Sequence, residues 1–145
     1  MLLAKNLLTD TNLNILDVAY ASGFKSLRRF NDSFKSKYKI SPSHFRKENN
    51  SFKTGTVTLK VGYKESFRYE ALLNFLARRA IPKIEKVENN KYYKTIAVKK
   101  NDSYVYGYII VSNNESKSAL EVTISENLVR VLPQVLSIVK NIFDL

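Results

Sequence analysis

Two short apolar-patterned segments on either side of Gly23 organise the first third of the chain. Ile15, Val18 and Ala19 are spaced three and four apart, which places them on one face of a helix. Asn14 precedes them and is a residue type that caps a helix N-terminus. Gly23 tolerates the positive φ that a tight turn between helices needs. The pattern therefore predicts a helix that ends in a glycine turn.

The second segment begins after Ser26, which can cap its first turn. Its inward stripe has spacings of three, four and four and consists of Leu27, Phe30, Phe34 and Tyr38. An ideal helix then turns outward Lys25, Arg29, Asp32, Ser33 and Ser36, with Arg28 on the flank. Such a helix pair is typical of a helix-turn-helix, whose arginines bind guanine in the major groove. A plain antiparallel helix pair with a solvated basic face fits the local pattern equally well.

Two further helices are expected around this pair. Residues 1–10 carry leucines at helical spacing. Ser41 followed by Pro42 is typical of a helix start, because proline suits the first turn. We expect Phe45 to face the core and Arg46 to face outward.

The pattern changes to a period of two after a polar stretch at 49–56. The expected strands lie near 57–61, 84–88, 92–98, 104–111 and 120–124, and the expected helices at 69–80 and 128–143. Pro133 moves the start of the last helix towards Val131. Asn89 and Asn90 predict a turn, and residues 113–116 a loop. The economical α+β arrangement is an antiparallel sheet with both helices on one face.

Composition limits the function classes. The 145 residues include 24 Lys and Arg against 13 Asp and Glu, a formal charge of +11, and 44% hydrophobic residues. A cationic globular protein favours a polyanionic partner, nucleic acid first. Cysteine is absent, which excludes disulfides, cysteine zinc sites and thiol nucleophiles. We expect no catalytic residue, metal or cofactor, and neither a signal peptide nor a membrane span, so the expected location is the cytoplasm.

Two features invite a stronger interpretation than their context supports. His44 is the single histidine, and no local motif places a carboxylate beside it, so we expect a surface residue. Tyr104, Tyr106 and Tyr108 alternate along one expected strand, which would suit stacking on single-stranded nucleic acid. The favoured interpretation is a half-buried tyrosine face with hydroxyls reaching water.

Residues 4–47 resemble the second helix-turn-helix of AraC/XylS-type regulators. The resemblance rests on the segments 4–11, 15–19, 22–26, 28–31 and 40–47. It implies a double-stranded DNA partner and a major-groove face made of Lys25, Arg28, Arg29, Asp32 and Ser33. The phosphate contacts we expect are Ser26, Lys35, Lys39 and Arg46. In that family a first helix-turn-helix precedes the helix at 1–10, so a second such unit is a candidate partner.

The second half resembles the N-terminal domain of AlkA-type 3-methyladenine DNA glycosylase II. The similar segments are 71–87, 91–98, 120–125 and 141–145. This resemblance implies a fold like one repeat of the TATA-binding protein, an antiparallel sheet with two helices. The expected organisation is a partial helix-turn-helix module at 1–48, a linker at 49–56 and the α+β domain at 57–145. The pairing is typical of Ada-like bifunctional regulators.

In the glycosylase family a catalytic helix-hairpin-helix domain follows the segment that ends here at Leu145. We therefore expect this chain not to be an enzyme, while the parent protein remains a candidate DNA glycosylase. The main hypothesis is a DNA-binding regulator linked to the alkylation damage response. One alternative is the non-catalytic front of a bifunctional glycosylase, with a helix-hairpin-helix domain as partner. Another is an interaction module in which residues 57–145 dock a partner through an apolar surface.

Overall fold

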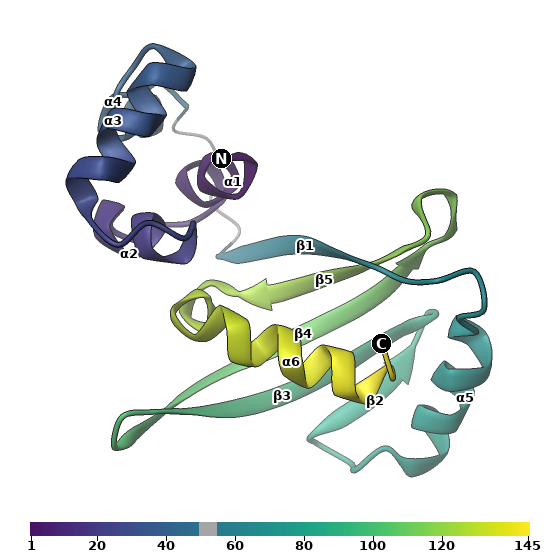
Figure 1. The fold of residues 1–145 in the computed structure, drawn as a ribbon. Coiled ribbons are helices and arrows are strands. Elements are labelled where there is room, and N and C mark those ends of the chain that lie inside the picture. The colour runs from purple at the N-terminus through teal and green to yellow at the C-terminus, as the bar shows by residue number, and fades with distance from the viewer. Residues whose placement is uncertain (50–54) are drawn as a thin grey trace. The chain divides into compact units, whose positions relative to one another are not determined.

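The computed structural model describes residues 1–49 and 55–145, and the chain divides into two compact units, 1–57 and 58–145 (Figure 1). The first unit is helical and the second consists of a sheet with helices, so the predicted α+β class is confirmed. The predicted linker at 49–56 falls largely outside the described residues and stays a prediction.

The helical unit contains α1 (Leu2–Asp10), α2 (Ile15–Ala21), α3 (Leu27–Tyr38) and α4 (Pro42–Glu48). Three of these helices begin at a residue whose side chain caps the first turn. Asn14 Oδ1 accepts a hydrogen bond from the backbone amide three residues later, at 2.8 Å. The hydroxyls of Ser26 and Ser41 each accept the equivalent hydrogen bond at 3.2 Å. Gly23 has φ of 93°, so the predicted caps and the glycine turn are confirmed.

Aromatic rings from α3 form the centre of the helical core. Phe30 and Phe34 are fully buried, and Phe34 meets Phe45 of α4 edge-on with ring centroids 5.5 Å apart. Tyr38 is half-buried at the end of the stripe. Leu27 departs from the expected inward stripe, because it lies in the first turn of α3 and remains 38% exposed. The interior of the helical unit is thus built from the middle of α3 together with fully buried residues of α1 and α2, among them Leu7 and Val18.

The second unit is a five-stranded antiparallel sheet with the strand order β1-β5-β4-β3-β2. Its strands are β1 (Thr56–Gly62), β2 (Glu85–Glu88), β3 (Lys91–Lys100), β4 (Ser103–Asn114) and β5 (Ala119–Ser125). Its helices are α5 (Tyr69–Arg79) and α6 (Leu132–Ile142), and two 3-10 turns, η1 (Glu115–Lys117) and η2 (Glu126–Val131), flank β5. Consecutive strands β2 to β5 form a meander, while β1 pairs with the last strand.

One face of the sheet is covered and forms the core. Ile109 and Val111 of β4 are fully buried on this side, and α6 lies across it (Figure 1). Phe143, just after α6, packs edge-on against Tyr92 of β3 with ring centroids 5.8 Å apart. The same ring stacks on Tyr69 of α5 at 6.3 Å. A single aromatic side chain therefore joins both helices to the sheet.

Several element limits differ from the expected ones. Asn113 and Asn114, expected in a loop, belong to β4, because they pair with Leu120 and Ala119 of β5. The last helix begins at Leu132 with proline in its first turn, after the η2 turn. The turn predicted at residues 89–90 is confirmed, with φ of 52° and 63° at its two asparagines.

Gly107 allows η2 to approach β4 closely. A Cβ atom placed there would lie 2.6 Å from Leu128 Cγ and would also overlap Ser125 Oγ. Ser125 Oγ in turn accepts a hydrogen bond from the Tyr108 amide at 3.1 Å. The absence of a side chain on this residue therefore sets the depth at which η2 packs.

Candidate nucleic-acid interface

The outward face of α3 carries the residues that the sequence analysis assigned to the major groove. Lys25, Arg28, Arg29, Asp32 and Ser33 are all exposed. Four of them, all except Arg28, line a shallow surface hollow together with the glycine turn. The structure therefore brings four of the five predicted residues together, while Arg28 is exposed outside this hollow.

The cations of this face are held by no neighbouring carboxylate. Within residues 1–49 and 55–145, no ion pair involves Lys25, Arg28 or Arg29. The segment 1–57 contains ten Lys and Arg against four Asp and Glu, a net charge of +6. This positive charge remains available to an anionic partner.

The predicted phosphate contacts lie at both ends of α3. Ser26 caps the helix through the Arg29 amide, so its hydroxyl already has one role. Lys35 is exposed in the last turn, and Lys39 follows the helix in the left-handed region with φ of 68°. Lys39 Nζ donates to the Ser36 carbonyl at 3.0 Å. At about 1.5 Å per residue, Arg28 and Lys39 lie roughly 16 Å apart along the axis.

The expectation that Arg46 faces outward is wrong. Its guanidinium is part-buried against the end of α1, where Nε donates to the Leu8 carbonyl at 3.2 Å and Nη2 to the carbonyls of Leu7 and Thr11 at 3.4 Å. Nη1 donates to the Leu13 carbonyl. The last carbonyls of a helix lack internal partners and carry partial negative charge, so a cation is favoured there. Arg46 is accordingly a structural residue and is no longer a phosphate candidate.

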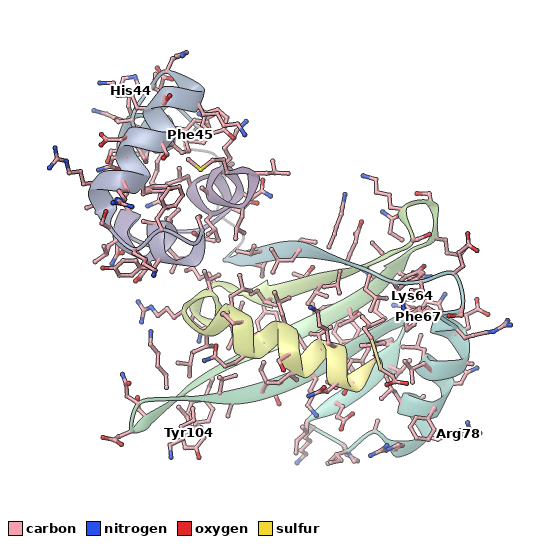
Figure 2. All side chains as sticks on the ribbon, in the orientation of Figure 1. His44, Phe45, Lys64, Phe67, Arg78 and Tyr104 are labelled. Carbon is pink, nitrogen blue, oxygen red and sulfur yellow. The ribbon has the colours of Figure 1, made fainter. Side chains whose placement is uncertain are left out.

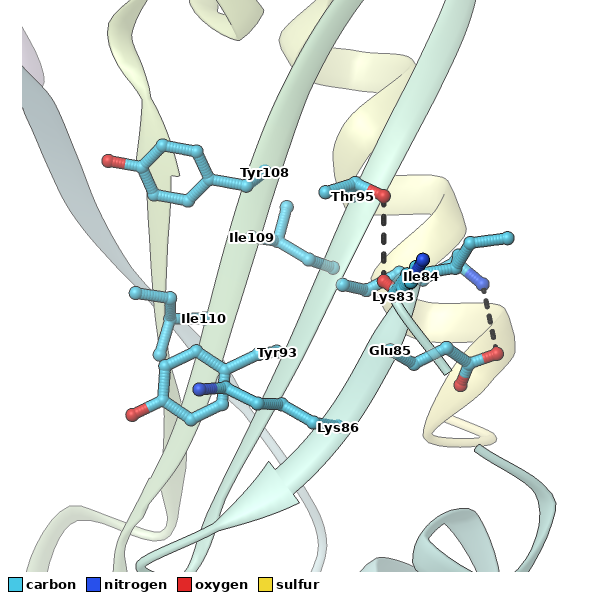
Figure 3. Close-up of a pocket in the computed structure, with 10 residues that line it drawn as sticks. Lys83, Ile84, Glu85, Lys86, Tyr93, Thr95, Tyr108, Ile109 and Ile110 are labelled. Atoms are coloured by element: carbon cyan, nitrogen blue, oxygen red, sulfur yellow. Dashed lines mark hydrogen bonds and ion pairs between the residues drawn. The ribbon is translucent and has the colours of Figure 1, made fainter. Parts of the chain in front are cut away.

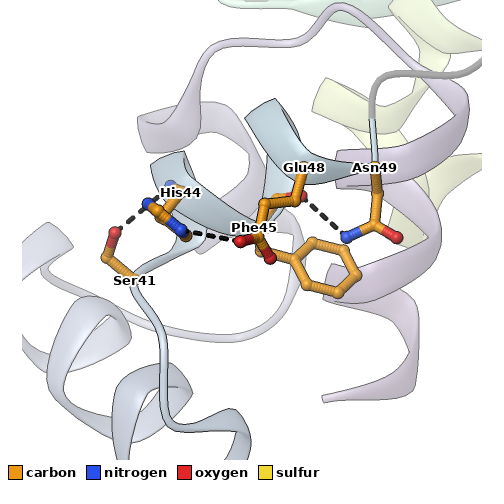
Figure 4. Close-up of polar contacts among 5 residues, drawn as sticks. All are labelled: Ser41, His44, Phe45, Glu48 and Asn49. Atoms are coloured by element: carbon orange, nitrogen blue, oxygen red, sulfur yellow. Dashed lines mark hydrogen bonds and ion pairs between the residues drawn. The ribbon is translucent and has the colours of Figure 1, made fainter.

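His44 lies on the surface as expected, but a carboxylate does lie beside it (Figure 4). His44 Nε2 is 2.9 Å from Glu48 Oε1, one helical turn further along α4. The spacing of four residues was the signal that the sequence analysis missed. Both side chains are more than half exposed, which is typical of a surface pair.

In the part of the chain that the structure describes, no group of three or more His, Cys, Asp and Glu side chains is arranged to hold a metal ion. None of the helices found in the same residues has the length and apolar character needed to cross a membrane.

Both halves of the chain match known protein families. Residues 1–48 match a helix-turn-helix domain family, and residues 58–145 match the AlkA N-terminal domain family. Two relatives, from the CDC 1551 / Oshkosh and ATCC 25618 / H37Rv strains of Mycobacterium tuberculosis, are each named a probable bifunctional transcriptional activator/DNA repair enzyme AlkA.

Each relative is 33% identical to this chain over 99 residues. The aligned part is 64% of this chain and 20% of the relative, so the chain spans about a fifth of the curated proteins it matches. The family match to residues 58–145 covers more than half of the chain. The chain therefore belongs to the AlkA N-terminal domain family, and residues 1–48, which precede that domain, match a helix-turn-helix domain.

Proposed function

We propose that this chain is the DNA-binding part of a transcriptional regulator tied to the repair of alkylated DNA. The observation that carries the proposal is the outward face of α3, where exposed and unpaired cations lie on a helix-turn-helix domain. The printed name of the two mycobacterial relatives joins transcriptional activation to DNA repair, which supports the second half of the proposal.

In the proposed complex α3 enters the major groove. Arg28 and Arg29, near its N-terminal end, donate to the O6 and N7 atoms of guanine, and Asp32 can accept from cytosine N4. Lys25 and Ser33 complete this base-facing surface. These contacts read sequence, because each base pair presents a distinct set of donors and acceptors in that groove.

The phosphate contacts in this proposal come from both ends of α3. Ser26 lies at its start, and Lys35 and Lys39 at its end, so together they would fix the register of the helix on the duplex. Arg46 has no part in the interface, because its guanidinium binds the end of α1.

The chain acts in this proposal without catalysis of its own, in the cytoplasm. A helix-hairpin-helix glycosylase domain or a second helix-turn-helix unit would act beside it in the complete protein. The alternative function is the non-catalytic front of a DNA-3-methyladenine glycosylase II in base-excision repair, which the match of residues 58–145 favours.

Fluorescence anisotropy on a labelled duplex, at low and near-physiological salt, tests the proposal. We expect the double variant Arg28→Ala/Arg29→Ala to bind at least about tenfold more weakly, since one bidentate arginine contributes about 1–3 kcal/mol. Arg78→Ala/Arg79→Ala is the matched control, because it also removes two exposed adjacent arginines from a helix, α5. Figure 2 labels the first of them, Arg78. An equal loss in both double variants would show that only the overall charge matters, and the α3 interface would be rejected.

A further inference from the structure

A row of tyrosines projects from the sheet face opposite α6. Tyr104, Tyr106 and Tyr108 alternate along β4 with residues that face the core, and they are 54%, 68% and 40% exposed. Figure 2 shows Tyr104 near the β3–β4 turn. These rings are more open to solvent than the half-buried face that the sequence analysis favoured. Their exposure requires an explanation, because large aromatic side chains are usually covered.

The neighbouring strand leaves these rings accessible and adds charge beside them. In the β3–β4 register, Lys99 lies opposite Tyr104 and Ala97 opposite Tyr106. Directly opposite residues of an antiparallel pair point to the same face. The short side chain of Ala97 leaves the Tyr106 ring uncovered, and Lys99 places an ammonium group beside the row.

On the other flank of the row β5 ends before it reaches Tyr106, and Asn127 of η2 donates to the Tyr106 carbonyl there. The paired residues of β4 and β5 begin at Ile109, so Tyr104 and Tyr106 lie on a two-stranded hairpin that extends past β5. Lys99 and Lys100 end the facing strand of this hairpin, and Asp102 is the one acid in its turn. The exposed aromatic row thus ends in a positively charged tip.

A pocket of about 380 Å³ continues the same surface towards β2. Tyr93, Tyr108 and Ile110 line it, and Lys86 Nζ lies 4.7 Å from the centre of the Tyr93 ring (Figure 3). Glu88 is neutralised by Lys86 at 3.0 Å. The second unit has 14 Lys and Arg against 9 Asp and Glu, a net charge of +5. The face therefore combines aromatic rings with a cationic rim.

We propose that this open face of the sheet, Tyr93 and residues 104–110 with the flanking lysines, binds single-stranded nucleic acid. Bases would stack on Tyr104, Tyr106 and Tyr108, while Lys99 contacts the phosphates. This site goes beyond the proposed function, because it lies in the other unit and takes a different form of nucleic acid.

The spacing of the rings favours a single strand over a duplex. Residues two apart on a strand are separated by about 6.6–6.8 Å, and the Tyr104 and Tyr106 centroids are 6.3 Å apart. A base in a duplex has both faces covered by its neighbours, whereas a splayed single strand can place one base on each ring. The cationic rim favours a polyanion over an apolar protein segment.

Binding of a fluorescein-labelled oligothymidylate to the full chain tests this site. We expect Tyr104→Ala/Tyr106→Ala to lower the affinity at least about tenfold, while Tyr104→Phe/Tyr106→Phe, which keeps the rings, stays within about twofold. Duplex binding in the same Ala variant should be unchanged. The chain has nine tyrosines and no tryptophan, so quenching of tyrosine emission reports stacking directly.

Three outcomes would overturn the site. One is the absence of oligothymidylate binding at low salt. Another is a loss of single-strand affinity in Arg28→Ala/Arg29→Ala but not in the tyrosine variant, which would place the strand on α3. A third is equal weakening of duplex and single strand by the tyrosine substitutions, with circular dichroism showing an intact fold. The first two outcomes do not depend on whether α3 binds a duplex, so the two proposals fail separately.

Discussion

The guanidinium of Arg46 closes the end of α1, with its Nε 3.2 Å from the carbonyl oxygen of Leu8, a residue 38 positions earlier in the chain. Further bonds run from the same group to three other carbonyls around that helix end. The C-cap of α1 is Thr11 in an extended conformation rather than a glycine, and the guanidinium adds charged donors to the carbonyls of this helix end. A basic residue that local pattern assigns to DNA instead joins the first and last helices of its unit.

Replacing Arg46 with alanine should destabilise the helical unit. Hydrogen bonds from a charged group contribute about 1.5–3 kcal/mol, so we expect a loss on the order of 2–3 kcal/mol. Arg46→Lys should restore only part of the lost stability, because an ammonium group lacks the planar set of donors with which a guanidinium binds several carbonyls. Urea unfolding followed by far-ultraviolet circular dichroism measures the change. Lys47→Ala, at an exposed neighbour, is the control, and equal stability of the two alanine variants would contradict the prediction.

Substitutions at Ser26 should separate its capping role from its proposed phosphate contact. Ser26→Ala removes the acceptor of the Arg29 amide and should cost about 1 kcal/mol. Ser26→Asp keeps a good cap and should preserve the melting temperature, while its negative charge repels phosphate and weakens duplex binding. Thermal unfolding and anisotropy measure the two effects. If Ser26→Asp bound the duplex as tightly as the parent, Ser26 would be only a cap.

Gly107→Val should disturb the packing of η2. The new side chain would enter the space held by Leu128, where even a Cβ lies 2.6 Å from Cγ, so we expect a loss of about 1–3 kcal/mol. Gly62→Ala is the control, since nothing lies within 4 Å of a Cβ built there. Adding Leu128→Ala to the valine variant makes a double-mutant cycle. Additive losses would show that the steric conflict lies elsewhere.

Stability should fall at alkaline pH. Burial raises the pKa of Tyr69 to about 12, and burial together with the Glu85 carboxylate raises the pKa of Tyr92 well above its usual range. In the unfolded chain tyrosine ionises near pH 10. The contribution of both phenols to the free energy of unfolding is therefore fully present below about pH 10. It is lost as the pH rises towards the pKa values of the folded state.

Urea unfolding across this pH range, with tyrosinate absorbance recorded in parallel, measures the effect. Tyr69→Phe loses the 2.6 Å bond from the hydroxyl to the Asn90 carbonyl and should show a shallower decline with pH. Tyr104→Phe, at an exposed position, is the matched control for removal of one phenol hydroxyl. If the stability of the parent and of both variants fell with pH at the same slope, groups other than Tyr69 would be responsible for the decline.

Local chemistry allowed much of the fold to be predicted. The caps at Asn14 and Ser26 and the turn at residues 89–90 depend on residues close in sequence, so short-range rules suffice. The exposure of Arg28 and Arg29 followed from helical periodicity once Phe30 was assigned to the core. Their role on DNA stays a prediction.

Features set by partners far along the chain could not be predicted in this way. Arg46 is of a charged residue type that usually lies on the surface, and only the position of α1 in the fold shows its carbonyl partners. Asn113 and Asn114 look like loop residues, but the neighbouring strand β5 extends β4 through them. The exposure of Tyr106 likewise depends on Ala97 across the hairpin, which a single-strand pattern does not contain.

The position of β1 beside β5 has a consequence for the order of assembly. The Thr58 hydroxyl lies 2.9 Å from that of Thr123, a contact spanning 65 residues, whereas strands β2 to β5 join neighbours along the chain. Because closing a long loop is slower than forming hairpins, the meander should form first and β1 should be the last strand to dock. Pulsed hydrogen exchange during refolding would show late protection of β1 amides, and protection of β1 and β4 in one phase would contradict this order. The strand that leads the sheet in sequence would then be the one that completes it.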